Sequence, residues 1–369
     1  MVALLERLVN TDTGSYDKPG IDQAILLIRE HLDALAFNTQ IIDFPDRGNH
    51  LLARKPGRSE RVMMLLGHCD TVFPAGTAAE RPFRIEGSRA HGPGVADMKG
   101  GLVVLIHALA AVKNTQPDVW DDLGFLVIIN SDEELSSATS RGMIETEAKQ
   151  AGAICVLEPA RPGGEYVTQR KGHGYYTLRV TGKSAHAGSQ PELGASAIHE
   201  LCQMGTKIQA LTDFATGLTL NIGVIRGGIR PNVVADFAEA EIDVRIRKIE
   251  DAELVEQALR EIAANHRIPG TRAELRGMID WPPMQQTAAN LRLFELVQRA
   301  GSELGLELKH TSTGAASDGN YASQFAPTID GMGPRGDGTH SPNEFIELPT
   351  LVERAKVLAR FITLWREAT

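Results

Sequence analysis

The sequence contains little cysteine, with three cysteines in 369 residues. Cys69, Cys155 and Cys202 are widely spaced and form no C-x-x-C pair. An odd, scattered set of thiols is typical of proteins from reducing compartments and argues against a disulfide-stabilised scaffold. We therefore predict that all three are small buried groups and that the protein is cytoplasmic.

Long hydrophobic runs are also absent, since no uninterrupted apolar stretch reaches the 18 residues that would indicate a membrane span. The N-terminal stretch carries Glu6 and Arg7 among its apolar residues, so it lacks the hydrophobic core of a signal peptide. These absences predict that the protein has no membrane partner. The alternative to a cytoplasmic location is the periplasm, if a leader has been removed.

Positive charge is in deficit, because 38 Lys and Arg stand against 47 Asp and Glu, a net charge of −9. Without a basic block, the chain lacks the electrostatic footprint of a nucleic-acid-binding protein. The fractions of hydrophobic and charged residues, 42% and 23%, are those of an ordinary globular protein. The length exceeds what one hydrophobic core usually covers, so we predict two domains.

Apolar runs alternate with helical patterns in the first half of the chain. Residues 62–66, 125–130 and 153–157 are nearly continuous apolar stretches, as in strands that are covered on both faces. Residues 100–112 and 139–150 between them have helical patterns. Alternating strands and helices predict an α/β catalytic domain with a largely parallel sheet.

The pattern then changes to β-α-β-β-α-β, which is the ferredoxin-like order. In the third of these strands, apolar residues such as Ile242 and Val244 alternate with charged ones, which predicts one buried and one exposed face. We assign residues 173–282 to an inserted domain. Residues 1–172 and 283–369 form the catalytic domain.

The first candidate site residues are in the segment His68-Cys69-Asp70, directly after the first apolar strand. In an extended chain His68 and Asp70 project to the same side, so Asp70 can accept the second imidazole N–H of a metal-bound His68. Ligands of open parallel sheets bind at the carboxyl ends of strands. Taken alone, a His-x-Asp pair is more often solvated on the surface.

A glycine-rich turn, residues 92–101, delivers Asp97 just before the apolar helix 102–112. Glycines allow the close approach and positive φ that a tight metal-binding loop requires. An alternative is that Asp97 caps the following helix. The spacing matches neither the Walker loop nor the dinucleotide fingerprint, so phosphate binding is the weaker interpretation.

Two further strand ends carry carboxylates. Glu133 and Glu134 follow the strand 125–130, and Glu158 follows the strand 153–157. Acidic side chains that converge at one rim of a sheet repel one another unless cations lie between them. Each acidic loop alone would be interpreted as solvated surface. Their joint occurrence predicts a site for two divalent metal ions.

A further ligand has to come from outside these strand ends. The late glycine-rich loop 336–344 offers His340, and His91 and His310 are alternatives on spacing alone. The residues by themselves leave this choice open.

Six motifs, GHCDTV, GPGVADMKGG, SDEE, LEP, SAHAGSQPELG and GTHSPNE, occur in this order over essentially the whole chain. They resemble those of the zinc metallopeptidase family that contains aminoacylases, acetylornithine deacetylases, succinyl-diaminopimelate desuccinylases and bacterial glutamate carboxypeptidases of the folate-cleaving type. The resemblance implies two bound Zn²⁺ ions, with Co²⁺ or Mn²⁺ as alternatives. The implied ligands are His68 and Glu158 for one ion, Glu134 and His340 for the other, and Asp97 as the bridge. A cis peptide bond after Asp97 is also implied.

The resemblance further implies that Glu133 is the general base and that Asp70 supports the first histidine ligand. His186 and Asn232 of the inserted domain would stabilise the oxyanion formed during hydrolysis. His186 would reach the site of the partner subunit, so the inserted domain would act as the lid and dimerisation domain of a homodimer. Without the resemblance, His186 would more simply cap the helix after Pro191.

Arg245 matches the arginine that binds the free α-carboxylate of the substrate in the carboxypeptidase branch, and a guanidinium suits this task because it binds in a bidentate way. Alternatively, it pairs with acidic neighbours between Glu239 and Asp243. We also place Gly314 among the substrate-binding residues. The loop around Gly314 is poorer in glycine than in the glutamate carboxypeptidases, which predicts a narrower pocket. The lysine that helps those enzymes to bind the glutamate side chain is missing near Tyr166.

We therefore predict metal-dependent hydrolysis of an amide or peptide bond next to a free carboxylate, in an N-acyl amino acid or at a C-terminal residue. The bacterial glutamate carboxypeptidases are the branch that the motifs match best. One alternative is an N-acetyl amino acid deacetylase or aminoacylase. An alternative of another class is a catalytically silent binding protein on the same fold.

Overall fold

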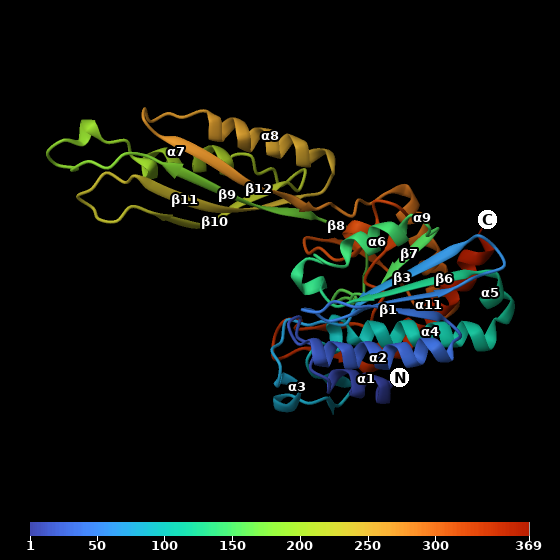
Figure 1. Ribbon diagram of the computed structural model, residues 1–369. Helices are drawn as coiled ribbons and strands as arrows, with labels where there is room; N and C mark the ends of the chain where they lie inside the picture. The colour runs from blue at the N-terminus through green and yellow to red at the C-terminus, as the bar shows by residue number, and fades with distance from the viewer. Residues whose placement is uncertain (369) are drawn as a thin grey trace. The chain divides into compact units, whose positions relative to one another are not determined.

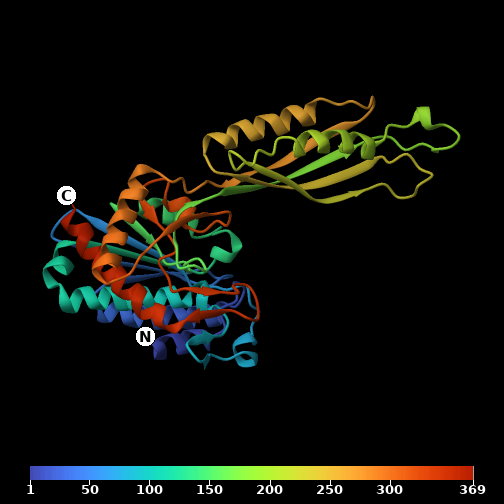
Figure 2. The ribbon, with the colours of Figure 1, turned by 180° about the vertical axis from the view of Figure 1, so that it is seen from behind.

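The computed structural model describes residues 1–368, which divide into two units (Figures 1 and 2). The second unit contains Arg170–Gln285 and Thr313–Ala316, and the first contains the other described residues. The sequence places the boundaries of the inserted domain at 173 and 282 and leaves the loop Thr313–Ala316 outside it. This loop belongs with the second unit because Arg170 Nη1 donates a hydrogen bond to the main-chain oxygen of Ala315 at 3.2 Å.

The first unit is built around a six-stranded sheet. Strands β3, β6, β7 and β14 are parallel, whereas β1 and β2 are antiparallel to their neighbours. In spatial order the strands are β1 (Asn38–Ile42), β2 (His50–Lys55), β6 (Gly124–Asn130), β3 (Val62–His68), β7 (Ala153–Val156) and β14 (Thr328–Ile329). Every residue of β6 is buried, as in a strand that is covered on both faces. The predicted α/β fold with a largely parallel sheet is confirmed.

Helices cover this sheet, with α2 and α4 on one face and α6 on the other (Figures 1 and 2). The helices of the unit are α1 (Val2–Val9), α2 (Lys18–Ala34), α3 (Thr77–Glu80), α4 (Gly100–Thr115), α5 (Pro117–Asp122), α6 (Arg141–Ala148), α9 (Ala288–Glu303), α10 (Gly319–Ala322) and α11 (Leu348–Glu367). The segment Val95–Thr115, which includes α4, is long and apolar enough to span a membrane. Most of it is buried inside the unit, as in the core helix of a globular protein.

A smaller sheet of the first unit brings the late loop to the glycine-rich turn. Its strands, in spatial order, are β15 (Gly336–Asp337), β16 (Phe345–Glu347), β5 (Arg89–His91) and β4 (Arg84–Glu86). Because β16 pairs with β5, the loop between β15 and β16, which carries His340, lies beside the turn that leads from β5 to Asp97. Two further strands, β8 (Tyr166–Arg170) and β13 (His310–Thr313), pair with each other.

The second unit has the element order β-α-β-β-α-β. Its elements are β9 (Gly172–Thr181), α7 (Ala197–Gln209), β10 (Thr219–Gly227), β11 (Phe237–Ile246), α8 (Glu250–Ala264) and β12 (Arg272–Trp281). The strands form an antiparallel sheet in the order β10-β11-β9-β12. Burial alternates along β11, and its buried residues Ile242 and Val244 share a core with Leu201 of α7 and Leu259 of α8. The two helices therefore cover one face of the sheet.

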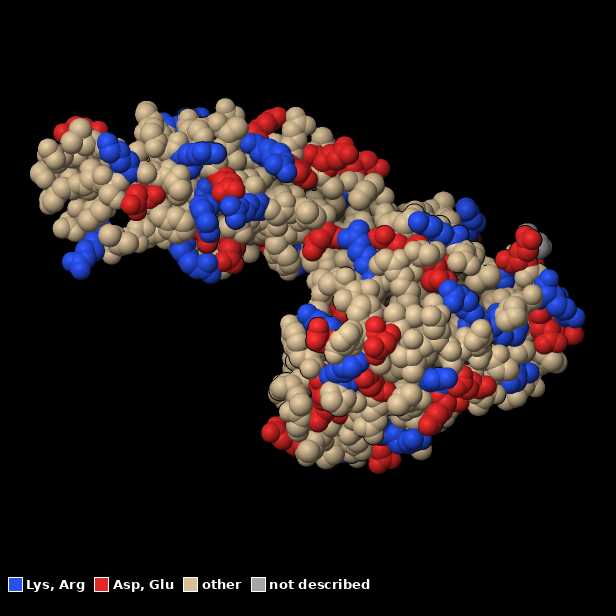
Figure 3. All heavy atoms as spheres, viewed as in Figure 1, with Lys and Arg blue, Asp and Glu red and all other residues tan. Residues whose placement is uncertain are grey.

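The three cysteines differ in burial. Cys69 and Cys155 are buried and free, whereas Cys202 is exposed. The prediction that all three are buried is therefore wrong for Cys202, because this residue lies on the outer side of α7 rather than on its apolar side. Charged side chains of both signs are mixed over the face of the molecule in Figure 3.

Candidate metal centre

His68 is the last residue of β3 and is fully enclosed, with 1% of its surface exposed. Its Nδ1 lies 3.1 Å from the main-chain oxygen of Asp70 and 3.4 Å from the carboxylate of the same residue. A carbonyl oxygen can only accept a hydrogen bond, so Nδ1 carries a proton in this arrangement. The lone pair of the neutral ring is then on Nε2, which is the nitrogen that can bind a metal ion.

Asp70 is completely buried and is itself held in place. The hydroxyl of Ser15 donates to its carboxylate at 2.8 Å, and the main-chain N–H groups of Glu133 and Glu134 donate to the same carboxylate at 3.3 Å each. Asp70 therefore ties the end of β3 to the turn that follows β6.

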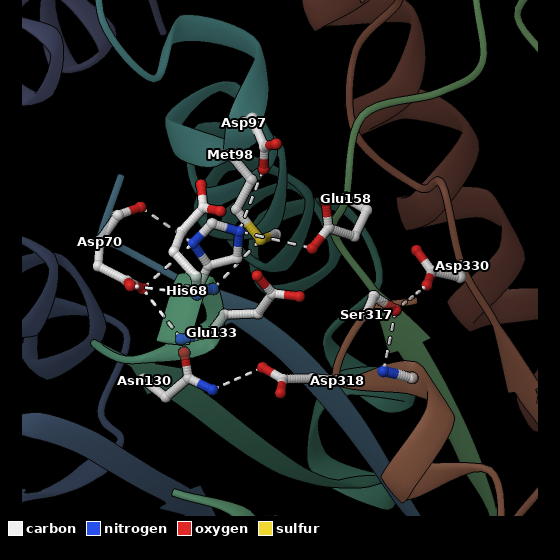
Figure 4. A network of polar contacts seen from close by, with 12 residues as sticks. His68, Asp70, Asp97, Met98, Asn130, Glu133, Glu158, Ser317, Asp318 and Asp330 are labelled. Carbon is white, nitrogen blue, oxygen red and sulfur yellow. Dashed lines mark hydrogen bonds and ion pairs between the residues drawn. The ribbon is translucent and has the colours of Figure 1, made fainter. Parts of the chain in front are cut away.

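The first candidate metal group consists of His68, Asp97 and Glu158 (Figure 4). His68 Nε2 lies 3.2 Å from Asp97 Oδ1 and 3.5 Å from Glu158 Oε1. Glu158 follows β7, the parallel neighbour of β3, so the two strand ends meet at one edge of the sheet.

The second candidate metal group consists of Asp97, Glu134 and His340. His340 Nε2 lies 3.2 Å from Asp97 Oδ2 and 3.2 Å from Glu134 Oε2. In each group the potential ligand atoms lie within 4.8 Å of one another. Asp97 presents one carboxylate oxygen to each group and so can bridge two ions.

The residues present fit a pair of divalent ions. Two imidazole nitrogens and three carboxylates form a donor set that suits Zn²⁺ and related metals. The other carboxylate oxygen of Glu134, Oε1, is buried and has no hydrogen-bond partner among the described residues. A buried carboxylate oxygen without a partner is costly unless a cation lies beside it.

The charges of the two groups depend strongly on each other. Burial raises the pKa of Asp97, but hydrogen bonds with His340 and His68 outweigh it and hold this pKa below its ordinary value. Hydrogen bonds with Asp97 and Glu134 raise the pKa of His340 to about 10. The centre therefore favours positive charge beside its carboxylates, as a metal site requires.

Glu133 lies in the short 3-10 turn Glu133–Leu135, directly after β6. Its carboxyl group points into the space beside His68 and Glu158 (Figure 4). Burial raises the pKa of this carboxyl group well above its ordinary value. Glu133 belongs to neither candidate metal group.

The turn that carries Asp97 is held by Glu344, which no sequence argument singled out. The Glu344 carboxylate accepts hydrogen bonds from the main-chain N–H groups of Gly94 and Ala96 at 2.8 Å each and of Asp97 at 3.0 Å. The peptide bond after Asp97 is cis, as the resemblance implies. Asp97 does not cap the following helix, because Lys99 is the N-cap residue of α4.

Asp318 is a second buried carboxylate that the sequence did not identify. It accepts a hydrogen bond from Asn130 at 2.5 Å (Figure 4) and another from the Ser137 hydroxyl. These two residues flank the turn with Glu133 in the sequence. Burial raises the pKa of Asp318 to about 7. The motif SDEE predicts the turn but gives no sign of a residue nearly two hundred positions away that holds both its ends.

The two alternative histidines are elsewhere. Among residues 1–368, neither His91 nor His310 belongs to a candidate metal group. His310 Nδ1 lies 2.9 Å from the hydroxyl of Thr168, and His91 lies on β5, where its ring contacts Phe345. His340 is thus the late histidine that the fold brings to the strand ends.

His186 and Asn232 lie in neighbouring exposed loops of the second unit. The main-chain N–H of Ala187 donates to the main-chain oxygen of Asn232 at 3.0 Å. His186 Nδ1 accepts N–H groups of Gly188 at 3.1 Å and Ser189 at 3.2 Å, so it closes its own loop. The alternative that His186 caps the helix after Pro191 is wrong, because Ser196 caps α7 and the 3-10 turn Pro191–Leu193 has no side-chain cap.

Arg245 lies on β11 of the second unit, paired with Asp243 two residues earlier. The distance from Arg245 Nη2 to Asp243 Oδ2 is 2.8 Å, and Nε donates to the same carboxylate. The pairing of Arg245 with an acidic neighbour, which the sequence allowed as an alternative, is therefore present. Gly314 is exposed in the loop Thr313–Ala316 of the same unit.

Residues 64–364 match the family described as peptidase family M20/M25/M40. The chain belongs to this family. It is 31% identical to carboxypeptidase G2 of Pseudomonas sp. (strain RS-16), over 98% of this chain and 88% of that protein. It is 29% identical to acetylornithine deacetylase of Vibrio cholerae, over 92% of this chain and 91% of that protein.

Solved structures show the same fold at lower identity. Aminopeptidase PepT of Bacillus cereus has a TM-score of 0.80 at 22% identity, covering 98% of this chain and 96% of that one. The dinuclear metal-binding peptidase YXEP of Bacillus subtilis has a TM-score of 0.73 at 17% identity, covering 100% and 98%.

As a member of peptidase family M20/M25/M40, the protein is a metallopeptidase that hydrolyses peptide or amide bonds. Family membership favours an enzyme over the catalytically silent binding protein that the sequence left as an alternative.

Proposed function

We propose that the protein is a di-zinc amidohydrolase that cleaves an amide or peptide bond next to a free carboxylate. The observation that carries this proposal is the pair of candidate ligand groups that share Asp97, with the carboxyl group of Glu133 beside them. The relatives support it, since one is named a carboxypeptidase and the other a deacetylase.

The candidate ligands divide between two ions. One ion would be held by His68 and Glu158, and the other by Glu134 and His340. Asp97 would be a ligand of both ions. When bound, the ions would act as Lewis acids that polarise the substrate carbonyl and lower the pKa of water to about 7. Metal analysis of the purified protein should find two equivalents of zinc, with cobalt and manganese as the alternatives. His340→Ala should leave one equivalent, and retention of both would contradict the assignment.

Glu133 would accept a proton from the attacking water and return it to the leaving nitrogen. The turn with Glu133 is held at both ends, by Asp318 through Asn130 and Ser137, and by the main-chain contact to Asp70. A base on so well-fixed a turn keeps its orientation through both proton transfers.

Groups of the second unit would bind the rest of the substrate. His186 Nδ1 is occupied by its own loop, which leaves Nε2 to stabilise the oxyanion together with the amide of Asn232. Asp243 holds Nε and Nη2 of Arg245, and Nη1 has no hydrogen-bond partner among residues 1–368. We propose that Arg245, with Gly314 in the loop Thr313–Ala316 of the same unit, receives the free carboxylate.

Amine release from a panel of N-acyl amino acids tests this function. The metal-loaded protein should cleave members with a free α-carboxylate and discriminate against the same compounds with that carboxylate amidated. Arg245→Ala should raise KM for the carboxylate substrates about 10- to 100-fold, because a charged hydrogen-bonded contact is lost. Arg276→Ala, an exposed arginine of β12 that pairs with Glu274, is the matched control. An unchanged KM in Arg245→Ala would instead favour an N-acetyl amino acid deacetylase that ignores the carboxylate.

We propose that the protein acts as a homodimer in the cytoplasm. The edge strand β10 and the loop after it expose the apolar side chains of Val224, Ile225 and Ile229, as a surface that joins subunits does. The free thiols of Cys69, Cys155 and Cys202 are consistent with a reducing compartment. Cell fractionation of a tagged protein checks the location, and recovery in the periplasmic fraction would contradict it.

A further inference from the structure

A pocket of about 530 Å³ in the first unit adjoins the metal centre. Three segments line it: residues 14–17 before α2, residues 71–75 after β3, and Glu134 with Leu135 in the turn after β6. Glu134 belongs both to this lining and to the second candidate metal group. The pocket therefore shares one residue with the candidate metal centre.

The walls of the pocket are built into the framework that holds the centre. The main-chain N–H of Ser15 donates to the oxygen of Thr71 at 3.1 Å, and the N–H of Thr71 donates to the oxygen of Thr13 at 2.8 Å. The Ser15 hydroxyl also donates to Asp70, the residue that orients His68. A pocket fixed by these bonds exists before any ligand arrives, which reduces the entropic cost of binding.

Large apolar side chains form part of the pocket wall. Tyr16 is 79% exposed and Val72 is 45% exposed, and Phe73 and Leu135 complete the apolar lining. Exposed apolar side chains gathered in a concave site are typical of a ligand pocket.

The charged residues in the lining are Asp17 and Glu134, and both are acidic. The guanidinium groups of Arg47 and Arg81 pack on the rings of Tyr16 at 5.1 Å and Phe73 at 4.7 Å, and neither arginine is part of the lining. The pocket therefore suits an uncharged apolar group and disfavours an anionic one.

The residues proposed to receive the carboxylate, Arg245 and Gly314, are both in the second unit, whereas the pocket is made by the first unit alone. The carboxylate half of the substrate thus has its own binding groups, and the pocket is available to the acyl half. Resting on the function proposed above, we infer that this pocket binds the acyl side of the scissile amide and selects a bulky, uncharged apolar acyl group over acetyl or succinyl.

Kinetics with one amino acid and three acyl groups test this inference. The kcat/KM for the N-hexanoyl compound should exceed that for the N-acetyl compound by about 10- to 100-fold, as full burial of such a chain allows, and the N-succinyl compound should be the poorest. Leu135→Trp, which fills the pocket, should reduce the preference for hexanoyl at least about tenfold, mainly through KM. Tyr16→Ala, a change at an exposed side chain that does not endanger folding, should also reduce the preference for hexanoyl over acetyl. Equal kcat/KM values for hexanoyl and acetyl, or a preference that Leu135→Trp and Tyr16→Ala leave intact, would overturn the inference.

Phe325→Ala is the matched control, because Phe325 is a 41% exposed aromatic residue of the same unit that does not line the pocket. This variant should retain the wild-type preference for hexanoyl over acetyl.

Calorimetry on the metal-loaded Glu133→Gln protein separates the pocket from the proposed function. The N-hexanoyl compound should bind more tightly than the N-acetyl compound, and adding Leu135→Trp should remove the difference. If the wild type cleaves no member of the panel, the proposed function fails. The inference about the pocket would still be supported if the N-hexanoyl compound binds more tightly and Leu135→Trp removes this difference. Equal affinities for the two compounds would overturn the pocket, whatever the turnover.

Discussion

Glu133 has a different environment from the carboxylates around it, although its neighbour Glu134 is a candidate ligand. We predict that Glu133→Gln lowers kcat by about 100- to 10,000-fold, the range that a positioned acid-base group contributes. Its metal content should stay at the wild-type value, because Glu133 lies outside both ligand groups. Amine-release kinetics and elemental analysis check the two parts. Loss of metal from this variant would show that Glu133 is a ligand rather than the base.

Glu344 acts on the centre without being a candidate ligand. Its carboxylate holds three main-chain N–H groups of the turn that ends at Asp97. We predict that Glu344→Gln, which replaces one of the two accepting oxygens by an NH2 group that cannot accept, weakens metal binding by about 10- to 100-fold. A competition titration with a chelating indicator measures the affinity. Asn343→Ala, the exposed neighbour, is the control, and equal affinities in both variants would contradict a positioning role for Glu344.

The residue scale shows where a sequence is informative. Asp97 and Glu134 can be recognised because a metal ligand needs a particular side chain in a short motif next to a strand end. Glu344 and Asp318 cannot, because their partners are main-chain N–H groups or small polar side chains from distant segments. Such partners leave no pattern of spacing in the chain.

Within the second unit, helix α7 is joined to the turn before β12 by one buried carboxylate. Glu200 accepts hydrogen bonds from the main-chain N–H groups of Arg267 at 2.8 Å and Ile268 at 2.5 Å, and from the hydroxyl of Thr271 at 3.1 Å. We predict that Glu200→Ala lowers the local free energy of opening by about 2 kcal/mol, because three donors lose a charged acceptor. Hydrogen exchange at residues 267 and 268 measures it directly. The exposed Glu253→Ala on α8 is the control and should leave this exchange unchanged.

The contribution of Glu200 also depends on pH. Burial raises the pKa of its carboxyl group, but hydrogen bonds from Arg267 and Ile268 outweigh it and lower this pKa below the ordinary value of 4.5. A carboxylate whose folded pKa is depressed adds stability that is complete above its unfolded pKa and is lost as the pH falls through the folded one. The difference in the local free energy of opening between the wild type and Glu200→Ala should therefore be constant near neutral pH and shrink below about pH 4.5. A difference that grows on acidification would contradict this assignment.

The elements themselves were the most predictable part of the fold. Apart from the polar residues His68 and Asn130 that end β3 and β6, the strands β3, β6 and β7 are apolar because both faces are covered, and β11 alternates because only one face is. The boundary of the second unit was less predictable at the loop Thr313–Ala316. This loop joins the unit through contacts with Arg170 and Lys171, which are distant in sequence.

At the scale of the whole molecule, the proposed dimer makes a sharp prediction about His186. If His186 completes the partner's site, a mixture of Glu133→Gln and His186→Ala proteins forms heterodimers with one intact site each. Two inactive proteins, unfolded and refolded together in equal amounts, should then regain about a quarter of the wild-type activity, since half of the dimers are mixed and each has one of two sites intact. No regain in a mixture shown to contain heterodimers would mean that His186 acts in its own subunit.

The same dimer can be dissociated at its proposed surface. Ile225→Asp places a charge on the exposed apolar edge of β10, and light scattering should then find the monomer mass together with a lower kcat. Ile85→Asp, at an exposed isoleucine of β4 in the first unit, is the control and should remain a dimer.

The sequence alone determined the α/β class, the inserted β-α-β-β-α-β segment and the residue types of a two-metal site. These features follow from periodicity and from short motifs at strand ends, which are local properties of the chain. Spacing alone left His91, His310 and His340 open, although the resemblance implied His340. The tertiary structure supplies the reason, because the pairing of β16 with β5 brings His340 beside Asp97 and Glu134. It also decided that Asp97 faces both groups and that an apolar pocket opens beside Glu134, because segments far apart in the chain have to meet before either exists.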